Sequence, residues 1–315
     1  MALYLREEDV ERLLSMGDLI PAVEEAFRLL AEGKAVNRPR DRVILGKEVL
    51  HVMSAGIPEL GVMGLKSYAT TPQGTRFVVL LYSTRGGELL AVIEADRLGQ
   101  LRTGAASAVA TKYMSRPESG SIGIIGAGKQ ARTQLAGVCA VRPIALVKAY
   151  SKNPDRCAAF AEEMIQALGV QVEPVGSAEE AVEGVDIVIT ATTASQPVLQ
   201  GGWLRPGVHI NAIGSNWAHK QEVDVETISH SHIVAVDSKE QARIESGDLI
   251  AAVHAGKLNW EDVVELADVV VGRVPGRRSP EEITLFESQG IALEDVAAAR
   301  IVYERAREAG AGQVF

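Results

Sequence analysis

The sequence contains little cysteine. Only Cys139 and Cys157 occur among its 315 residues, and their spacing fits neither a zinc site nor a disulfide framework. We therefore expect both side chains to serve as packing residues. The six histidines form no cluster with metal-ligand spacing, so the sequence predicts no metal site.

Long apolar runs and an excess of basic residues are also missing. No apolar run reaches the roughly 18 residues of a membrane span. The first residues include Glu7, Glu8 and Asp9, where a signal peptide needs a basic start and an apolar core. The formal net charge is −9, which leaves no general basic field to attract nucleic acid or anionic lipid. We therefore expect a cytoplasmic protein that binds neither membranes nor nucleic acid and holds any anionic ligand by local contacts.

The composition that is present is typical of a globular protein. Hydrophobic residues make up 47% of the chain and charged residues 23%, so the chain should fold completely. A chain of this length can bury a large core and is expected to divide into about two domains.

The N-terminal part of the chain predicts two helices followed by a sheet. From Arg6 to Leu30, apolar residues recur at helical spacing and are interrupted around Gly17, which predicts two amphipathic helices. The next segment, to about Ala95, is richer in Val, Ile, Tyr and Gly and contains short apolar runs separated by turn residues. These runs are residues 42–45, 50–53, 64–68, 77–82 and 89–93. They predict a meander of antiparallel strands.

A change of composition marks the predicted domain boundary. Between Asp96 and Met114 the chain is rich in Ala, Thr and Gly, and residues 115–120 then supply a break. Beyond the break, short apolar runs alternate with helical ones that begin near Lys129 and Pro154. The apolar runs are residues 121–125, 144–150, 185–191, 209–212 and 233–236. Such alternation is typical of a parallel sheet covered by helices on both faces.

The sequence therefore predicts an α/β protein. Residues 119–292 are expected to form a Rossmann-type doubly wound parallel sheet, and residues 1–118 an α+β domain. A last amphipathic run, within residues 293–315, could return to the first domain and complete it.

A glycine loop points to a dinucleotide. The pattern G-x-G-x-x-A lies directly after a predicted strand and at the start of a predicted helix. Gly126 allows a tight turn, Gly128 lets a diphosphate approach the backbone, and Ala131 lets the helix pack closely on the strand. Amide groups at the helix start then face the negative charge. The other predicted cofactor-binding residues in and beyond this loop are Lys129, Gln130, Thr192 and Gly214.

The end of the second Rossmann strand indicates which dinucleotide is bound. NAD-selective sites usually have an acid here to accept the ribose hydroxyls, whereas this chain has Ser151 and Lys152, with Arg156 one turn later. We include these three residues in the cofactor site, and the two cations favour the 2′-phosphate of NADP. NAD stays an alternative if Lys152 and Arg156 only point into solvent.

Several segments together resemble the ornithine cyclodeaminase/μ-crystallin family along nearly the whole chain. They are Pro39–Arg42, Gly64–Lys66, Leu101–Thr111, Gly126–Ala131 and His209–Gly214. The resemblance implies an N-terminal substrate-binding and dimerisation domain joined by the C-terminal helix, a Rossmann domain, and a homodimer. Members of this family include ornithine cyclodeaminases, amino-acid dehydrogenases, ketimine and pyrroline-2-carboxylate reductases, and some dehydratases, so the resemblance alone does not fix the reaction.

The resemblance also implies a group of cations that grips the substrate carboxylate. It falls on Arg40, Lys66 and Arg102, with Arg42 or Arg38 as alternatives to Arg40. Arginine offers a planar fork to a carboxylate, and a partly desolvated lysine can add a point charge or move a proton. The alternative interpretation is that these residues form ordinary ion pairs.

The chain departs from the ornithine cyclodeaminases at two places. Those enzymes carry an acid two residues beyond the glycine that corresponds to Gly214, whereas this chain has Asn216, which cannot accept a proton at neutral pH. They also have a glutamate near the position of His51. Both changes weaken the case for a diamine substrate. We assign Asn216 and Lys66 to the catalytic set and His51 to the substrate-binding set.

For each of three further side chains, the sequence leaves two roles open. His51 could act as a general acid or be a packed strand residue. His219 and Lys220, which follow the loop of Asn216, could lie over the site or belong to a surface loop.

The favoured function is reduction of a small imino or 2-oxo acid with NAD(P)H, or the reverse oxidation of an amino acid. A preformed cyclic imine asks least of Asn216, because no water must be activated. The alternatives are an ornithine cyclodeaminase with internally recycled NAD, a cofactor-independent hydroxyproline dehydratase, and a non-catalytic binding protein.

Overall fold

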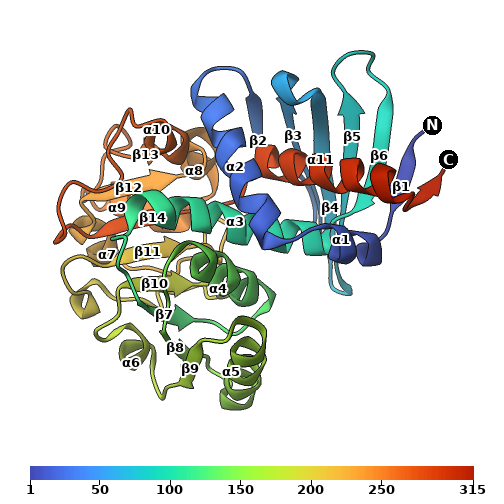
Figure 1. The fold of residues 1–315 in the computed structure, drawn as a ribbon. Helices are drawn as coiled ribbons and strands as arrows, with labels where there is room; N and C mark the ends of the chain where they lie inside the picture. Colours follow the sequence, from blue (N-terminus) through green and yellow to red (C-terminus); the bar gives the residue numbers. More distant parts are fainter. The chain divides into compact units, whose positions relative to one another are not determined.

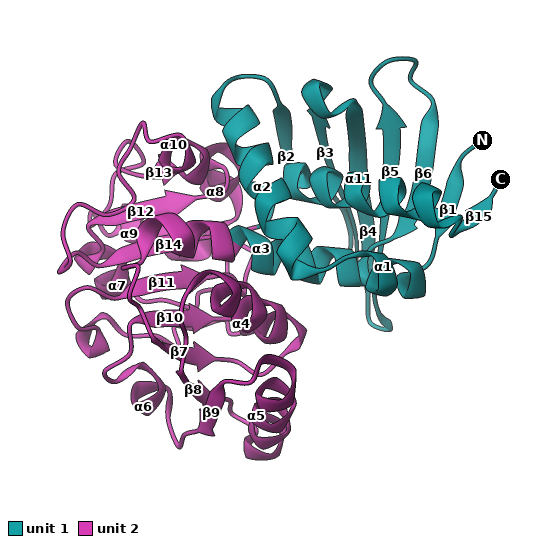
Figure 2. Cartoon of the chain, viewed as in Figure 1, with its two compact units in different colours: residues 1–106, 290–315 teal, residues 107–289 magenta.

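The computed structural model describes residues 1–315 and divides into two compact units (Figure 2). Unit 1 comprises residues 1–106 and 290–315, and unit 2 comprises residues 107–289. Both boundaries differ from the predicted ones, since residues 107–118 belong to unit 2 and residues 290–292 to unit 1.

The first difference has a visible cause at the end of helix α3 (Asp96–Met114). Arg142 Nη2 donates hydrogen bonds to the carbonyls of Thr111 and Lys112, and Arg277 Nε donates to the carbonyl of Met114. These bonds attach the last turn of α3 to the end of α4 (Lys129–Val141) and to the loop before β14 (Thr284–Glu287), both in unit 2. A helix can thus begin in one unit and end in the other, which a change of composition at residue 115 does not reveal.

Unit 1 is built on a seven-stranded sheet in the order β15-β1-β6-β5-β4-β3-β2. Its strands are β1 (Leu3–Leu5), β2 (Val36–Leu45), β3 (Glu48–Ile57), β4 (Val62–Thr71), β5 (Gly74–Ser83), β6 (Leu89–Glu94) and β15 (Gln313–Val314). Neighbours from β2 to β6 pair antiparallel, as the sequence predicts. The additional β1 pairs with β6 and β15, which brings the two ends of the chain together (Figure 1).

The helices of unit 1 are α1 (Glu7–Leu13), α2 (Met16–Ala31) and α11 (Ala292–Ala309), with the short 3-10 helix η1 (Pro58–Leu60) between β3 and β4. The interruption between α1 and α2 lies at Leu14 and Ser15 rather than at Gly17. The reason is that the Ser15 hydroxyl accepts a hydrogen bond from the Asp18 amide and caps α2 one residue before its first turn.

Helix α11 runs across β2 to β5 (Figure 1). Buried and exposed side chains alternate along these strands, and this alternation determines which side chains face α11. In β3 the buried side chains Val49, His51 and Met53 alternate with the exposed Leu50 and Val52. Because consecutive strand residues point to opposite faces, one face of the sheet carries the core of unit 1 beneath α11.

Unit 2 is a parallel eight-stranded sheet in the order β13-β12-β14-β11-β10-β7-β8-β9. Its strands are β7 (Ser121–Ile125), β8 (Leu146–Tyr150), β9 (Gln171–Pro174), β10 (Ile187–Thr190), β11 (His209–Ala212), β12 (Ile233–Val236), β13 (Val264–Glu265) and β14 (Thr284–Glu287). Its helices are α4 (Lys129–Val141), α5 (Pro154–Leu168), α6 (Ala178–Val182), α7 (Val225–His230), α8 (Lys239–Glu245), α9 (Gly247–His254) and α10 (Leu266–Val270), with a 3-10 helix η2 (Gly201–Trp203). The predicted doubly wound Rossmann-type sheet is confirmed.

The core of unit 2 consists of two apolar clusters. One contains Leu135 of α4 and Phe160 of α5, and the other contains Leu199, Ile228 and Leu249. The strand order reverses at β7, which lies between β10 and β8. Open parallel sheets bind ligands at the carboxyl ends of the strands at such a reversal.

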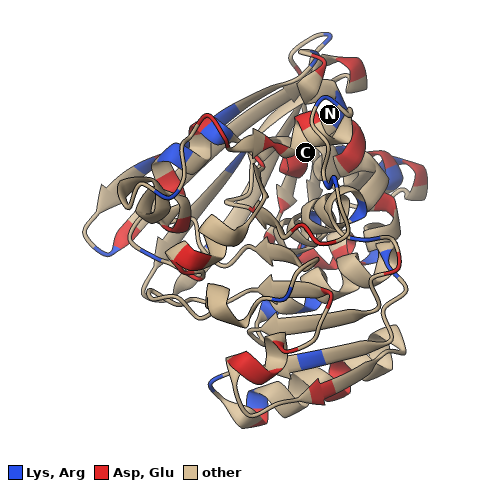
Figure 3. Ribbon diagram, turned by 90° about the vertical axis from the view of Figure 1, so that its left-hand side faces the viewer, with Lys and Arg blue, Asp and Glu red and all other residues tan.

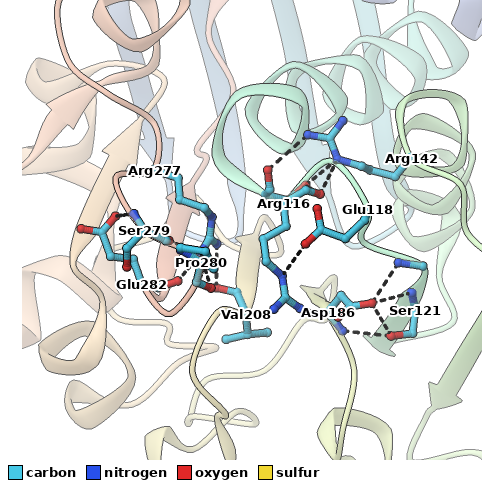
Figure 4. Close-up of polar contacts among 12 residues, drawn as sticks. Arg116, Glu118, Ser121, Arg142, Asp186, Val208, Arg277, Ser279, Pro280 and Glu282 are labelled. Carbon is cyan, nitrogen blue, oxygen red and sulfur yellow. Dashed lines mark hydrogen bonds and ion pairs between the residues drawn. The ribbon is translucent and has the colours of Figure 1, made fainter.

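The opposite, amino-terminal edge of this sheet is held by arginines (Figure 4). Arg116 Nη2 lies 2.6 Å from Asp186 Oδ1, and the other oxygen of Asp186 accepts from the amides of Gly120 and Ser121. Arg277 donates to several backbone carbonyls, among them Val208. These donors are engaged by carbonyls and carboxylates of the same unit, so we assign this edge a structural role.

None of the helices combines the length and the apolar composition of a membrane span. Basic residues are distributed among acidic ones along the chain (Figure 3). No group of three or more His, Cys, Asp or Glu side chains is arranged to hold a metal ion. Cys157 is buried and Cys139 half-buried, and burial raises the pKa of the Cys139 thiol to about 12, so both are packed, unreactive side chains.

Candidate active site

The glycine loop between β7 and α4 has a backbone that only glycine can adopt. Gly126 has φ +120°, and a Cβ atom at this position would lie 2.3 Å from the carbonyl oxygen of Ala191. Gly128 is the N-cap of α4, and the first turn of α4 carries no acidic residue. The positive end of the helix dipole is therefore not neutralised by the protein and is suited to an anion.

Two arginines fix the same loop from its carbonyl side. Arg132 Nη1 donates to the carbonyls of Ala127 and Gly128, and Glu163 holds the rest of its guanidinium. Arg156 Nε donates to the carbonyl of Ala127 at 3.1 Å. The Gly126 amide donates to the Tyr150 carbonyl at 2.8 Å, so the start of α4 is the part of this loop that can face an anion.

A pocket of about 460 Å³ opens beside this loop. Predicted residues that line it are Gly126, Gly128, Ser151, Lys152, Arg156 and Thr192. The pocket lies at the carboxyl ends of β7, β8 and β10, and the terminal Nη2 of Arg156 lies 3.7 Å from where a Gly128 Cβ would be. A glycine turn, a helix start without acidic residues beside it and two cations in the pocket fit the diphosphate and ribose of a dinucleotide.

Four other predicted cofactor residues do not line this pocket. Ala131 is fully buried in the apolar core under the loop, which fits its predicted packing role. Lys129 is exposed and Gln130 half-buried in the first turn of α4. Gly214 is half-buried in the loop after β11.

A residue that the sequence does not predict organises the loops after β10 and β11. Glu222 is 1% exposed, and its carboxylate accepts hydrogen bonds from the Gly214 amide and from the amide and hydroxyl of Thr192, each at 2.6 Å. It also accepts from the Thr190 hydroxyl at 2.9 Å. Burial raises its pKa, and these donors oppose the shift. Glu222 thereby holds Thr192 in the wall of the pocket, although no motif in the sequence marks it.

The predicted carboxylate-binding cations meet in unit 1. Lys66 of β4 lies 2.7 Å from Asp295 Oδ2, and Arg102 Nε lies 3.0 Å from Asp295 Oδ1. Arg102 Nη1 also lies 2.6 Å from Glu294 Oε2. All four side chains are buried. Four charged side chains buried together form a polar cluster, which the packing of an apolar core alone does not explain.

Neither carboxylate of this cluster is among the predicted site residues. Asp295 and Glu294 lie in the first turn of α11, and Asp295 is followed at helical spacing by the buried Ala299 and Val302. An acid on the apolar side of an amphipathic helix is a signal that the sequence does contain.

Arg40 is the buried arginine of its segment. Its Nη2 donates to the Gly290 carbonyl at 3.1 Å, whereas Arg38 is exposed and Arg42 is half-buried. Arg40 and Arg102 both lower the pKa of Lys66 after burial itself, and the three effects outweigh Asp295 to bring that pKa to about 8. The Lys66 amine is thus mostly a cation at pH 7 but loses its proton more readily than an exposed lysine.

His51 is a packed neutral histidine. Its ring stacks on Tyr68 with centroids 4.1 Å apart, and its Nδ1 accepts from Arg42 Nε at 3.2 Å. Burial, followed by the neighbouring Arg42, Arg40 and Lys66, lowers the pKa of His51 to about 4. At neutral pH its ring is uncharged, which argues against the general-acid alternative.

The loop after β11 carries Asn216 and His219. Asn216 is half-buried, His219 is exposed and stands 5.6 Å from the Trp217 ring, and Lys220 is half-buried. Nothing in this loop tests the catalytic role of Asn216, which therefore stays a prediction.

The chain is similar over its full length to several known proteins. It is 39% identical over 321 residues to an alanine dehydrogenase of Archaeoglobus fulgidus, covering 98% of this chain and 97% of that protein. The structure of a Δ1-pyrroline-2-carboxylate reductase of Thermococcus litoralis, in complex with NADH and L-proline, shares 40% identity with a TM-score of 0.96, covering 99% of this chain and 100% of that one. An archaeal alanine dehydrogenase dimer with bound NAD shares 38% identity with a TM-score of 0.94, covering 99% and 98%.

A family model agrees with these relatives. The model of the ornithine cyclodeaminase/mu-crystallin family matches residues 2–310. Since this match and relatives above 30% identity both span nearly the whole chain, the chain belongs to the ornithine cyclodeaminase/mu-crystallin family.

Proposed function

We propose that this protein reduces small imino or 2-oxo acids with NAD(P)H, and in reverse oxidises the corresponding amino acids. It is an oxidoreductase that acts on carbon–nitrogen bonds with a nicotinamide dinucleotide, as are the related reductase and dehydrogenases. In this chain the proposal rests on one observation: Lys66, Arg102 and Arg40 are all buried in unit 1. Their amine and guanidinium groups can bind and orient a substrate carboxylate.

Three buried cations suit a substrate with a carboxylate. Lys66 and Arg102 both contact Asp295, and Arg40 is near enough to lower the pKa of Lys66. Arg102 provides a planar fork that can fix the orientation of a substrate carboxylate, and the Lys66 ammonium adds a point charge.

The protein's own groups would place and protonate the substrate. A bound dinucleotide supplies the hydride. The Lys66 ammonium holds a proton at neutral pH and can keep an imine nitrogen protonated, and Asn216 can donate or accept a hydrogen bond but cannot take up a proton.

A preformed cyclic imine is the substrate class that these residues serve best. An open-chain 2-oxo acid must first add ammonia at its carbonyl carbon and then lose water from the adduct to form the imine, and the proton transfers of these steps need a base that Asn216 cannot provide. Oxidation of NAD(P)H should therefore be faster with five- or six-membered cyclic 2-imino acids than with pyruvate plus ammonia. Equal or faster turnover of pyruvate plus ammonia would move the assignment to an amino-acid dehydrogenase.

The dinucleotide is expected to be NADP(H) rather than NAD(H). Lys152 and Arg156 line the pocket beside the glycine loop, and β8 ends without an acid. Lys152→Ala should weaken NADPH binding about ten- to a hundredfold, because a charge-assisted contact is worth roughly 1.5–3 kcal/mol, and should change NADH binding little. Lys148→Ala, within β8 and outside the pocket, is the matched control. Tighter binding of NADH than of NADPH by the unaltered protein in a fluorescence titration would reject this preference.

The protein is expected to be a homodimer, like the related archaeal alanine dehydrogenase that forms a dimer. The face of the unit 1 sheet opposite α11 carries Leu50, Val52 and Met63, which are 42%, 36% and 39% exposed. The pairing of β3 with β4 places these three side chains on one face. Replacing Leu50 and Val52 together by arginine should give monomers in sedimentation experiments, whereas Ile165→Arg on the exposed side of α5 should not. A monomeric unaltered protein at micromolar concentration would contradict the assignment.

A further inference from the structure

Asp295 contacts both cations of the proposed carboxylate site at once. It is fully buried, and its two oxygens lie 2.7 and 2.9 Å from Lys66 Nζ, while the nearer one to Arg102 lies 3.0 Å from Nε. Asp295 belongs to α11, near the end of the chain, whereas Lys66 and Arg102 come from β4 and α3. A single carboxylate thus joins three elements of unit 1.

The neighbouring Glu294 differs in its contacts. Its carboxylate lies 2.6 Å from Arg102 Nη1, and no ion pair joins it to Lys66. The two adjacent acids therefore separate two effects, since both hold Arg102 but Asp295 also holds Lys66.

We propose that Asp295 is a positioning residue of the reaction, which keeps Lys66 protonated and fixes the Arg102 guanidinium against it. This inference rests on the proposed function, because it assumes that Lys66 acts as a cation toward the substrate. The titratable and charged groups around the Lys66 amine are Asp295, Arg102, Arg40, His51 and the Tyr68 ring.

The neighbouring charges determine the direction in which the Lys66 pKa moves when Asp295 loses its charge. Arg102 and Arg40 oppose the charge of Lys66, His51 is neutral at pH 7, and Tyr68 lies with its ring centroid 5.8 Å from Nζ. Asp295 is the anion of this group that contacts the amine. Loss of its charge must therefore lower the Lys66 pKa further below its present value of about 8.

The test compares the pH dependence of kcat/KM for a cyclic 2-imino acid in three proteins: unaltered, Asp295→Asn and Glu294→Gln. kcat/KM follows ionisations of the free enzyme and the free substrate, and the substrate contributes equally to all three profiles. The unaltered protein should lose activity as pH rises through about 8. In Asp295→Asn this loss should move to lower pH by about one unit or more, whereas in Glu294→Gln its midpoint should stay in place.

Further variants guard the interpretation. Lys66→Met should lack the high-pH loss altogether, and Asp295→Glu, which retains the charge, should keep the midpoint near that of the unaltered protein even if kcat/KM falls. NADPH binding and the melting temperature confirm that each variant is folded, and Asp295→Glu carries the test if Asp295→Asn does not fold.

The two hypotheses fail in different ways. Suppose that Lys66→Met removes the high-pH loss of activity but Asp295→Asn leaves the midpoint of that loss unchanged, or that Asp295→Glu shifts the midpoint to lower pH although it keeps the charge. The proposed role of Asp295 is then wrong, while the proposed function stands. If Lys66→Met turns over normally and keeps the same loss, Lys66 is not the cation, and the proposed site itself is wrong.

Discussion

Arg102→Lys is expected to lower kcat/KM for a cyclic 2-imino acid by on the order of a hundredfold, mainly by raising KM. Lysine keeps the positive charge between Glu294 and Asp295 but lacks the planar fork that can hold those acids and a substrate carboxylate together. A lost charge-assisted contact is worth roughly 1.5–3 kcal/mol. Arg102→Ala is less informative, because it removes one cationic partner from each of two buried carboxylates, Glu294 and Asp295, and so should also destabilise the fold.

The controls for Arg102→Lys lie in the same unit and in the cofactor site. Arg38→Lys, at an exposed position of β2, should leave kcat/KM unchanged. NADPH affinity, which depends on unit 2, should also be unchanged in Arg102→Lys. Normal KM and kcat in Arg102→Lys would remove this residue from the substrate site.

Gly126→Ala is expected to weaken binding of NADH and NADPH by on the order of a hundredfold. The added Cβ would lie 2.3 Å from the Ala191 carbonyl oxygen, at a backbone φ of +120° that side chains rarely adopt. Strain of this kind costs about 1–3 kcal/mol before the clash is counted. The loop can relieve it only by moving, and the start of α4 would then no longer be placed to face the diphosphate.

Gly202→Ala is the matched control in the same unit, because a Cβ there meets nothing within 4 Å. It should bind dinucleotides normally in a fluorescence titration. Unchanged affinity in a folded Gly126→Ala protein would show that the diphosphate does not bind at this loop.

Local patterns predict most of the fold. The alternation in β3 and the continuous apolar runs of β7 and β10 follow from which faces are buried, so they are visible in the sequence. The fold class and the family are confirmed. Strand β14 is not predictable in this way. It has four residues and polar ends, and Thr284 and Glu287 are buried only because Met114, Ser246 and Gln289 supply hydrogen-bond partners from elsewhere.

Some residues of the candidate site can likewise be predicted from local sequence, and others cannot. The glycine loop and the cations Lys66 and Arg102 stand in recognisable segments, whereas Glu222 and Asp295 act through contacts with residues 30 and 229 positions away. Such partners acquire their meaning only when the chain folds. The charge of Asp295 on the buried side of α11 was the one trace of its role in the sequence.

Turnover of Δ1-pyrroline-2-carboxylate with NADPH and of ornithine with NAD, measured on one preparation, tests the proposed reaction most directly. Reduction of the ready-made imine needs a held carboxylate and a protonated nitrogen, whereas cyclodeamination needs several further proton transfers that Asn216 cannot perform at pH 7. We expect rapid NADPH oxidation with stoichiometric proline from the imine, and neither proline nor ammonia from ornithine. Robust formation of proline and ammonia from ornithine, with the cyclic imine left unreduced, would contradict the assignment.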